Sequence, residues 1–246
     1  MQIQISDSYT SEMDEIAAGC EGATFYHSRV WAESLSATFP RMIFRCLVAR
    51  RDRTAAGFFP FFLIRRGPFK TAWSMPFGTY GGPVAEEKDC AVALRQAYGG
   101  FTSTAGLVNA GWIDFDGAAG DPDWDRQTAD THLIDLTGGF DKLWEESIEK
   151  QRKKRTRRAE KLGVTVRRMN SDDDLRTYYK IYSCRLKEWG EKTKYPLKLF
   201  EELLKRGGDT VRLYMAEHEG EIVGGHFNFY SRNMVTAWNG VTTPES

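Results

Sequence analysis

KQRKKRTRRAEKLGVTV, residues 150–166, is the most strongly charged stretch of this 246-residue chain. Eight of the twelve residues from Lys150 to Lys161 are Lys or Arg, and only Glu160 opposes them. Because the chain is formally neutral, this stretch carries +7 and all other residues together carry −7. A charge so concentrated produces a strong local positive potential. Lys and Arg favour a helix here, which we expect to end at Gly163 and to lead into a strand at Val164.

The basic segment has two interpretations. A run of like charges is most often a solvated helical face or a disordered segment. Apolar residues at helical spacing on both sides of the run favour a packed helix instead. These apolar residues are Leu143, Trp144, Ile148, Ala159 and Leu162. Arg152, Arg155 and Arg158 recur every third residue, so they fan over one side of such a helix. Since guanidinium groups bind phosphate with paired hydrogen bonds, we predict an anion site at these three arginines and Lys161.

Composition bounds the class of protein. Hydrophobic residues make up 41% and aromatic residues 13%, enough for a packed core in one large or two small domains. Four scattered cysteines without a C-x-x-C pair indicate reduced thiols rather than a zinc or redox site. The first residues lack the features of a signal peptide, and the apolar patch Gly57–Ile64 is too short to span a bilayer. Asp172–Asp174 lacks the alternating spacing of calcium ligands, so we expect no metal.

The spacing of apolar residues divides the first half into short helices and strands. Apolar residues at helical spacing predict three helices in this half. One begins at Ser11, one lies within Ala23–Phe39 and one spans Glu86–Tyr98. Alternating or β-rich stretches predict strands between and after them. These strands are Gln2–Ile5, Met42–Ala49, Ala55–Ile64, Thr71–Met75, Ala110–Phe115 and Thr131–Leu136. Short turns join the three strands between Met42 and Met75, which predicts an antiparallel meander.

The residues after the basic segment repeat this order of elements. After a strand at Val164–Val166, Ser171 and three aspartates predict a helix start with an acidic first turn. A second helix begins at Pro196 and closes at Gly207. Three strands follow, at Val211–Glu217, Glu221–Tyr230 and Met234–Val241. A strand, two helices and a three-stranded meander thus occur in both halves, which predicts two similar domains in tandem.

A glycine-rich loop, Pro76–Pro83, connects the first meander to the helix that follows. Glycines between a strand and a helix can bring backbone N–H groups close to a phosphate. They can equally serve only as turn positions with positive φ. The spacing is not that of a P-loop or a dinucleotide-binding fingerprint, so both alternatives stay open. In the first alternative Tyr80, Gly81 and Gly82 would line a binding cleft.

The sequence resembles a known family over most of its length, from about Thr24 to Ser246. Ala216–Gly225 is similar to the central hairpin of the GNAT acetyltransferase fold, and three further segments together resemble the FemAB family. These segments are Tyr26-His27-Ser28 with Trp31, Ser74–Gly82 and Arg155–Val164. The resemblance implies an α/β (α+β) fold of two tandem GNAT-like domains with mixed, largely antiparallel sheets. We place the first domain at 1–141, a basic connecting helix at 142–163 and the second domain at 164–246.

The resemblance also implies that the second domain is incomplete. A complete GNAT-like domain continues after its third meander strand with a helix and two or three more strands. The sequence reaches Ser246 just after that third strand. We therefore expect that the second domain is represented by its N-terminal part only.

Members of the FemAB family form peptide bonds, and the best-known ones move an amino acid from aminoacyl-tRNA to the side-chain amine of a peptidoglycan precursor. The resemblance thus implies an acyltransferase that acts on an amine, with no permanently bound cofactor and with aminoacyl-tRNA or acyl-CoA as co-substrate. Its partners would be a phosphorylated small-molecule or lipid-linked precursor and, in the first case, tRNA. The implied location is the cytoplasm, either free or peripheral to the inner membrane face.

Two other functions stay open on the sequence. One is an acetyl-CoA-dependent GNAT acetyltransferase that modifies a small molecule or polysaccharide precursor. Neither half has the Arg/Gln-x-x-Gly-x-Gly/Ala loop of coenzyme A binding, which disfavours this use for the first domain. The other is a non-catalytic binder of tRNA or another anionic polymer through the basic helix. The run contains no interleaved aromatic residues that would stack on bases, which lowers this alternative.

Few single residues can be assigned a role from the sequence. His27 has no Cys or carboxylate pattern near it, so we expect it to cap or pack rather than catalyse. Trp189, His226 and Trp238 are candidates for a substrate cleft, although burial in a core is the commoner fate of tryptophan. A general base would be a carboxylate, His226 or the substrate itself, and the sequence does not choose among them.

Overall fold

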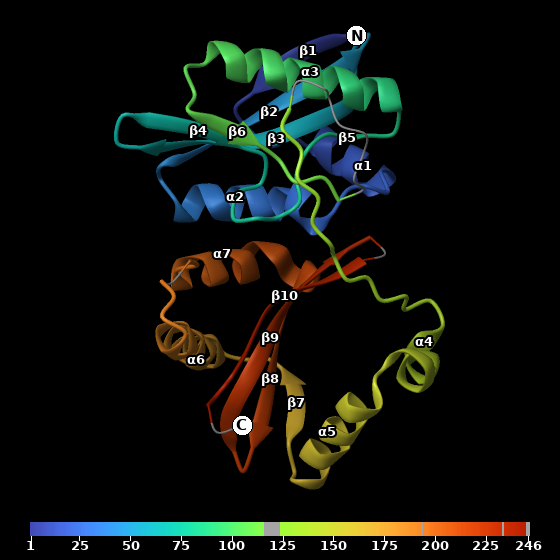
Figure 1. Cartoon of the computed structure of the whole chain (residues 1–246), viewed down its shortest axis with the longest axis vertical. Coiled ribbons are helices and arrows are strands. Elements are labelled where there is room, and N and C mark those ends of the chain that lie inside the picture. The colour runs from blue at the N-terminus through green and yellow to red at the C-terminus, as the bar shows by residue number, and fades with distance from the viewer. Residues whose placement is uncertain (116–123, 193, 233, 245–246) are drawn as a thin grey trace. The chain divides into compact units, whose positions relative to one another are not determined.

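A computed structural model describes residues 1–115, 124–192, 194–232 and 234–244. By its internal contacts the chain divides into two compact units (Figure 1). Unit 1 comprises residues 1–125, 194–211 and 228–236, and unit 2 comprises residues 126–193, 212–227 and 237–246. Each unit therefore combines segments from both halves of the sequence. The linear division into 1–141, 142–163 and 164–246 stays a prediction.

Unit 1 is built on a six-stranded sheet in the order β1-β2-β3-β4-β6, with β5 paired to β3. Its strands are β1 (Gln2–Ser6), β2 (Met42–Arg51), β3 (Thr54–Arg66), β4 (Phe69–Trp73), β5 (Val84–Ala85) and β6 (Asn109–Gly111). All pairs are antiparallel except β4 with β6. The predicted meander is confirmed. The strand predicted at 110–115 is wrong in its extent, because pairing ends at Gly111.

Helices cover both faces of this sheet. On one face lies α3 (Lys88–Thr104), and on the other lie α1 (Ser11–Gly19) and α2 (Arg29–Thr38) (Figure 1). On the α3 face Phe59 and Phe61 pack around Tyr98. Because both faces are covered, β3 reads as a continuous apolar run, Phe58–Phe62, instead of alternating.

Segments from the second half complete unit 1. The helix α7 (Leu197–Gly207) packs on α2, and Arg206 approaches Glu33 at 3.6 Å. The ring of Phe229, from the end of β9, stacks on Phe25 with the ring centroids 4.0 Å apart. The side chains of Leu199, Phe200, Leu203 and Phe229 are all fully buried. This burial makes the second-half segments part of the same core.

Unit 2 contains most of a four-stranded sheet in the order β10-β9-β8-β7. Its elements are β7 (Thr165–Arg168), α6 (Asp172–Glu188), β8 (Val211–His218), β9 (Glu221–Ser231) and β10 (Met234–Thr242). Ser171 caps α6 as predicted, since its hydroxyl accepts a hydrogen bond from the N–H of Asp174 at 3.2 Å. Tyr178 from α6 donates its hydroxyl to the carbonyl of Asn239 at 3.0 Å. The helix is thereby fixed on the sheet.

The repeat of elements predicted from the sequence is confirmed. The first half runs β1-α1-α2-β2-β3-β4 and the second runs β7-α6-α7-β8-β9-β10. The four strands also have the same neighbours in the two sheets, β1-β2-β3-β4 and β7-β8-β9-β10. The fold class is therefore the predicted one, a tandem α+β arrangement with mixed, largely antiparallel sheets.

The segment between the two halves differs from the prediction. Residues 131–136 form no strand, and Leu133, Ile134 and Leu136 are exposed. A short helix α4 (Gly139–Lys142) and a π-helical turn η2 (Leu143–Ser147) follow, and the helix α5 (Lys150–Lys161) begins after extended backbone at Ile148. Without neighbouring strands, an apolar alternation alone gives no sheet. Among the helices in the described ranges, none is long and apolar enough to cross a bilayer.

Candidate functional site

The glycine-rich loop, Pro76–Pro83, has an unusual backbone together with Met75 directly before it. Met75 and Phe77 have φ of 51° and 77°, and Gly78 and Gly82 have φ of 75° and 95°. Positive φ is uncommon for residues with a side chain and costs about 1–2 kcal/mol. The loop therefore needs strong local contacts to keep this shape.

Ser74 supplies these contacts from the base of the loop. Its hydroxyl donates to the carbonyl of Pro60 on β3 and accepts from the N–H of Gly82 at 2.8 Å. At the tip, the hydroxyl of Thr79 donates to the carbonyl of Met75 at 3.0 Å. Ser74 and Thr79 are both buried. One buried hydroxyl thus ties the end of the loop to the central strand.

Gly81 and Gly82 are close to protein atoms. The N–H of Gly81 donates to the carbonyl of Ile113 at 2.8 Å, and that of Gly82 donates to Ser74. A Cβ on Gly81 would lie 2.6 Å from Ser74, and one on Gly82 would lie 2.7 Å from a carboxylate oxygen of Asp114. Both glycines are buried. Their amides already have acceptors, so the glycines serve close packing and do not offer N–H groups to a phosphate.

His27 is a buried residue close to the backbone of Gly81 in the loop. Its Nδ1 accepts the backbone N–H of Thr24 at 3.0 Å, which forms a capping box for the 3-10 helix η1 (Phe25–His27). The hydroxyl of Tyr9 donates to the carbonyl of His27 at 2.7 Å. Burial lowers the pKa of His27 to about 4, against a smaller opposite effect of the backbone of Gly81 and Thr24. The imidazole is therefore neutral near pH 7, and the predicted capping role is confirmed.

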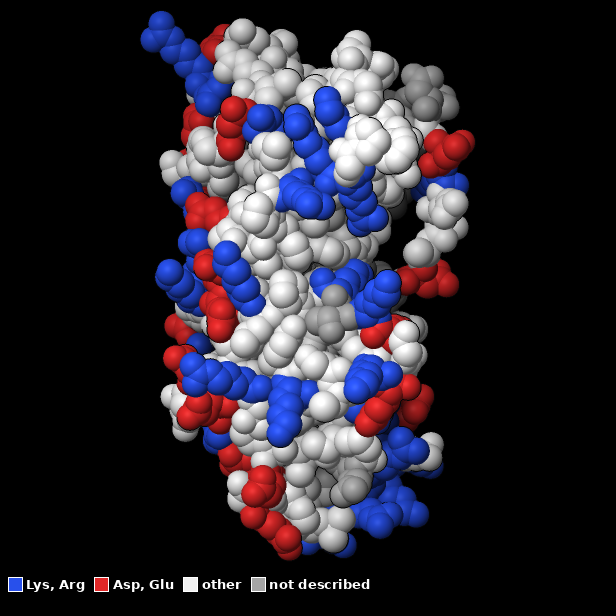
Figure 2. Space-filling model, turned by 90° about the vertical axis from the view of Figure 1, so that its left-hand side faces the viewer, with Lys and Arg blue, Asp and Glu red and all other residues white. Residues whose placement is uncertain are grey.

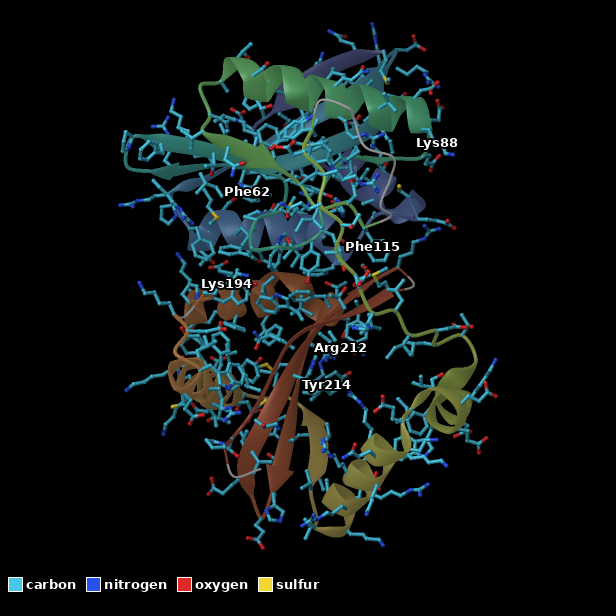
Figure 3. All side chains as sticks on the ribbon, in the orientation of Figure 1. Phe62, Lys88, Phe115, Lys194, Arg212 and Tyr214 are labelled. Atoms are coloured by element: carbon cyan, nitrogen blue, oxygen red, sulfur yellow. The ribbon has the colours of Figure 1, made fainter. Side chains whose placement is uncertain are left out.

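Three tyrosines from distant parts of the sequence meet beside the loop. Tyr26 is buried, and its ring lies 6.1 Å from that of Tyr80. Burial raises the pKa of Tyr26, and Tyr195 and Tyr80 raise it further because their hydroxyl groups lie near. Phe115, labelled in Figure 3, packs edge-on against Tyr80 at 5.0 Å. The three hydroxyl groups are thus concentrated in one aromatic region of unit 1.

Lys194 adds a cation to this region (Figure 3). Its ammonium donates to the carbonyl of Phe77 at 2.8 Å. It also lies 5.8 Å from the centre of the Phe77 ring and 5.4 Å from that of Tyr195. We name Tyr26, Phe77, Tyr80, Lys194 and Tyr195 the tyrosine site. Phenol donors, aromatic faces and one ammonium group are chemistry suited to a polar organic ligand that carries negative charge.

The basic helix α5 is the second candidate region, and it lies in unit 2. Arg152, Arg155, Arg158 and Lys161 are all exposed, and α5, which the structure describes completely, has no buried residue. The expectation that the arginines lie in a packed element is wrong, because Leu162 is exposed and a break at Ile148 separates α5 from Trp144. The helix ends at Gly163 with φ of 81°, as predicted. It therefore presents a solvated, strongly cationic surface.

Aromatic residues accompany the basic helix in space. Trp144 stacks on Phe140 with the ring centroids 5.7 Å apart, and the guanidinium of Arg157 lies 6.0 Å from the Trp144 ring. Lys153 donates to the carbonyl of Glu145 at 2.9 Å. The basic run itself lacks aromatic residues, but the turn before it places two of them beside the cations. This arrangement increases the range of ligands that α5 can contact.

The remaining predicted residues are divided among elements of unit 2. Trp189 is 56% exposed at the end of α6, with the guanidinium of Arg185 5.1 Å from its ring, so the expected burial is wrong. Trp238 packs edge-on against Phe227 at 5.7 Å. His226 is half-buried on β9, and its ring occupies the space that a side chain at Gly240 would need. Their assignment to a substrate cleft stays a prediction.

The sequence prediction missed part of the tyrosine site. Tyr80 was predicted, and Tyr26 and Phe77 were part of the family resemblance, but Lys194 and Tyr195 gave no signal, because aromatic and basic residues are common in connectors. Only the return of the chain to unit 1 at Lys194 brings them to the loop.

A hollow of about 530 Å³ lies between α3 and β6 and is lined by residues that include Gln96, Gly99, Asn109 and Trp124. None of its lining residues was predicted for the site.

Comparison with known proteins places the chain among acyltransferase folds. Residues 147–246 match the family model described as an acetyltransferase (GNAT) domain. No curated protein matches the sequence at a significant level. The solved structure of FemX is 12% identical and aligns with a TM-score of 0.70 over 100% of this chain and 81% of that one. The C-terminal domain of a protein from Agrobacterium fabrum described as a lysylphosphatidylglycerol synthetase is 10% identical, with a TM-score of 0.54 over 96% of this chain and 68% of that one.

These similarities agree with the internal architecture. The family model covers the second half of the chain, and the alignment with FemX covers both halves. At such low identity the structural likeness concerns the fold. The chain therefore has a fold like that of FemX, and its residues 147–246 match the model of an acetyltransferase (GNAT) domain.

Proposed function

We propose that this protein is an N-acyltransferase that moves an aminoacyl or acyl group onto an amine. The observation that carries the proposal is the duplicated GNAT-like order of elements, whose second copy matches an acetyltransferase model. In the finer form of the proposal, the donor is aminoacyl-tRNA and the acceptor is a side-chain amine of a peptidoglycan precursor. The fold shared with FemX supports this choice of donor and acceptor.

The reaction needs few protein groups. The neutral amine attacks the ester carbonyl, the C–N bond forms, the C–O bond to the tRNA breaks, and the amine proton passes to the leaving oxygen or to solvent. The protein must align the two substrates and stabilise the negative oxygen of the tetrahedral intermediate. No nucleophilic triad is required. Hydroxyl and ammonium donors such as those of Tyr80 and Lys194 are suited to the developing charge.

We assign phosphate binding to the basic helix. Arg152, Arg155, Arg158 and Lys161 are exposed and are free of ion pairs with any residue that the structure describes. Both substrates of the finer proposal contain phosphate, in the tRNA backbone or in the precursor diphosphate. Guanidinium groups bind such oxygens with paired hydrogen bonds, and their binding weakens as salt rises. The tyrosine site would bind the peptide or sugar part of the acceptor.

A transfer assay with the Arg155→Ala, Arg158→Ala double variant tests the proposal. Labelled aminoacyl-tRNA and purified peptidoglycan precursor are the substrates, and product is counted over time. Loss of two phosphate contacts should raise KM for the phosphorylated substrate at least tenfold, with a similar effect of added salt on the parent protein. The matched control is Lys187→Ala, Lys192→Ala, which removes two exposed cations elsewhere. Equal kinetics in both variants would remove α5 from the mechanism.

The match to an acetyltransferase model favours one second candidate, an acetyl-CoA-dependent transferase. Titration calorimetry with coenzyme A separates the two. Micromolar binding of coenzyme A together with acetyl transfer would favour this candidate. Binding of tRNA with a steep salt dependence, but with no transfer from either donor, would favour a non-catalytic binder.

A further inference from the structure

A second group of cations, distant in sequence from α5, lies at the end of the β3–β4 hairpin in unit 1. It consists of Arg41, Arg65, Arg66 and Lys70, which are all exposed. Figure 2 shows Lys and Arg side chains gathered on this part of the surface. We name these four residues the hairpin patch. The function proposed above makes no use of it.

Strand pairing forces the charges of this patch together. Arg65 and Lys70 are direct partners in the β3–β4 register, and the N–H of Arg65 donates to the carbonyl of Arg41 at 3.3 Å. A row of three cations therefore crosses three neighbouring chain segments. Like charges opposite each other destabilise a sheet. In the described parts of the chain no acidic side chain pairs with any of the four, although the next cation along β2, Arg45, has Asp7 at 3.3 Å. An anionic partner outside the protein would relieve this repulsion.

The same end of the sheet exposes apolar groups. Gly67 and Pro68 form the two-residue loop, with φ of 60° at Gly67 as such loops require. Phe69, directly after the loop, is 57% exposed. Val108 is 61% exposed and is held beside the hairpin, since its N–H donates to the carbonyl of Lys70 at 2.9 Å. A proline, a phenylalanine and a valine thus lie among the cations at the tip of the hairpin.

We propose that the hairpin patch docks on an anionic phospholipid bilayer. An aromatic ring beside aliphatic groups matches the interface between headgroups and acyl chains, where Phe69 and Val108 would enter. Long Lys and Arg side chains can then reach the lipid phosphates. Each cation close to such a surface strengthens binding about fivefold. RNA would use the cations and the Phe69 ring, but Pro68 and Val108 offer nothing to a base, so the bilayer accounts for more of the patch.

Vesicle sedimentation tests this proposal. The vesicles contain equal parts of phosphatidylglycerol and phosphatidylcholine, and pure phosphatidylcholine vesicles serve as the uncharged reference. The variant Arg65→Gln, Arg66→Gln, Lys70→Gln should lower the partition coefficient onto anionic vesicles about a hundredfold. The control Lys187→Gln, Lys192→Gln, Lys198→Gln removes the same charge from other exposed positions. Because α5 also attracts anionic lipid, the partition coefficient of the variant is compared with that of the control. An equal decrease in the partition coefficient of both would overturn the proposal.

A dye at the hairpin tip reports insertion directly. Phe69→Cys is made in a Cys184→Ser background, because Cys184 is the exposed cysteine among the four. An environment-sensitive dye at position 69 should shift its emission to the blue on anionic vesicles, whereas the same dye on Cys184 of the parent chain should not. If the emission of the dye at position 69 does not shift, the proposal that the tip inserts into the bilayer is wrong. Loss of binding to a tRNA probe by the triple variant, with unchanged vesicle binding, would assign the patch to RNA instead.

Discussion

The glycine-rich loop of unit 1 and the basic helix of unit 2 were both predicted to hold a ligand, yet the two are built in opposite ways. The loop has buried glycines whose amides are satisfied by Ser74 and Ile113. The helix has no buried residue, and its four candidate cations are exposed. The loop is thus a rigid support that positions Tyr80, whereas α5 contributes charge without packing. Substitutions should therefore change the stability of the protein at the loop and only its binding at the helix.

The largest effect is expected at Gly82. In Gly82→Ala the Cβ would meet Asp114 at 2.7 Å and Trp112 at 2.9 Å, at a φ of 95° that L-residues disfavour. We expect a loss of about 2–5 kcal/mol in the free energy of unfolding. Gly78→Ala is the matched control, since it has a similar φ of 75° but no atom within 4 Å, and should cost about 1–2 kcal/mol. Urea unfolding of both variants measures the difference, and equal losses would mean that close packing does not define the loop.

His27 should make unit 1 sensitive to mild acid. Its pKa in the folded state is about 4, below the ordinary value of 6.5. The unfolded chain therefore takes up a proton that the folded chain refuses, so stability is full above pH 6.5 and falls as the pH drops toward 4. The total loss is about 3 kcal/mol. Protection factors for hydrogen exchange, which are corrected for the intrinsic effect of pH on the exchange rate, should fall over this range in peptides from β2 and β3, and in His27→Gln this fall should be absent.

Asp174 should make unit 2 sensitive only to stronger acid. Hydrogen bonds from the Arg167 guanidinium, at 2.6 Å and 2.8 Å, lower the pKa of Asp174 to about 2. Stability from this pair is present above the ordinary pKa near 3.8 and is lost as the pH falls through 2, a change of about 2 kcal/mol. Protection factors in peptides from α6 should therefore fall only below pH 4, and Asp174→Asn should lower them already at pH 7. A fall in the protection factors of both units in one pH range would contradict this assignment.

Much of the fold could be predicted because local signals and packing agree. Ser171 and Gly163 specify element ends through backbone chemistry that needs no partner, and both are as predicted. The strand predicted at Thr131–Leu136 fails because alternation needs a neighbouring strand to pair with, and the sequence does not reveal the neighbour. For the same reason Lys194 and Tyr195 of the tyrosine site were missed, since they meet Phe77 only through long-range packing.

The smallest effect on stability is expected at α5, and it separates charge from packing most clearly. Arg155→Ala with Arg158→Ala removes two exposed cations from a helix without buried residues, and alanine favours the helix. The free energy of unfolding should therefore change by less than about 0.5 kcal/mol, although the same variant should weaken phosphate binding at least tenfold. The measurement is urea unfolding beside the transfer assay. A loss of stability comparable to that of Gly82→Ala would mean that α5 is packed in solution, and a weakened activity could then no longer be attributed to lost phosphate contacts.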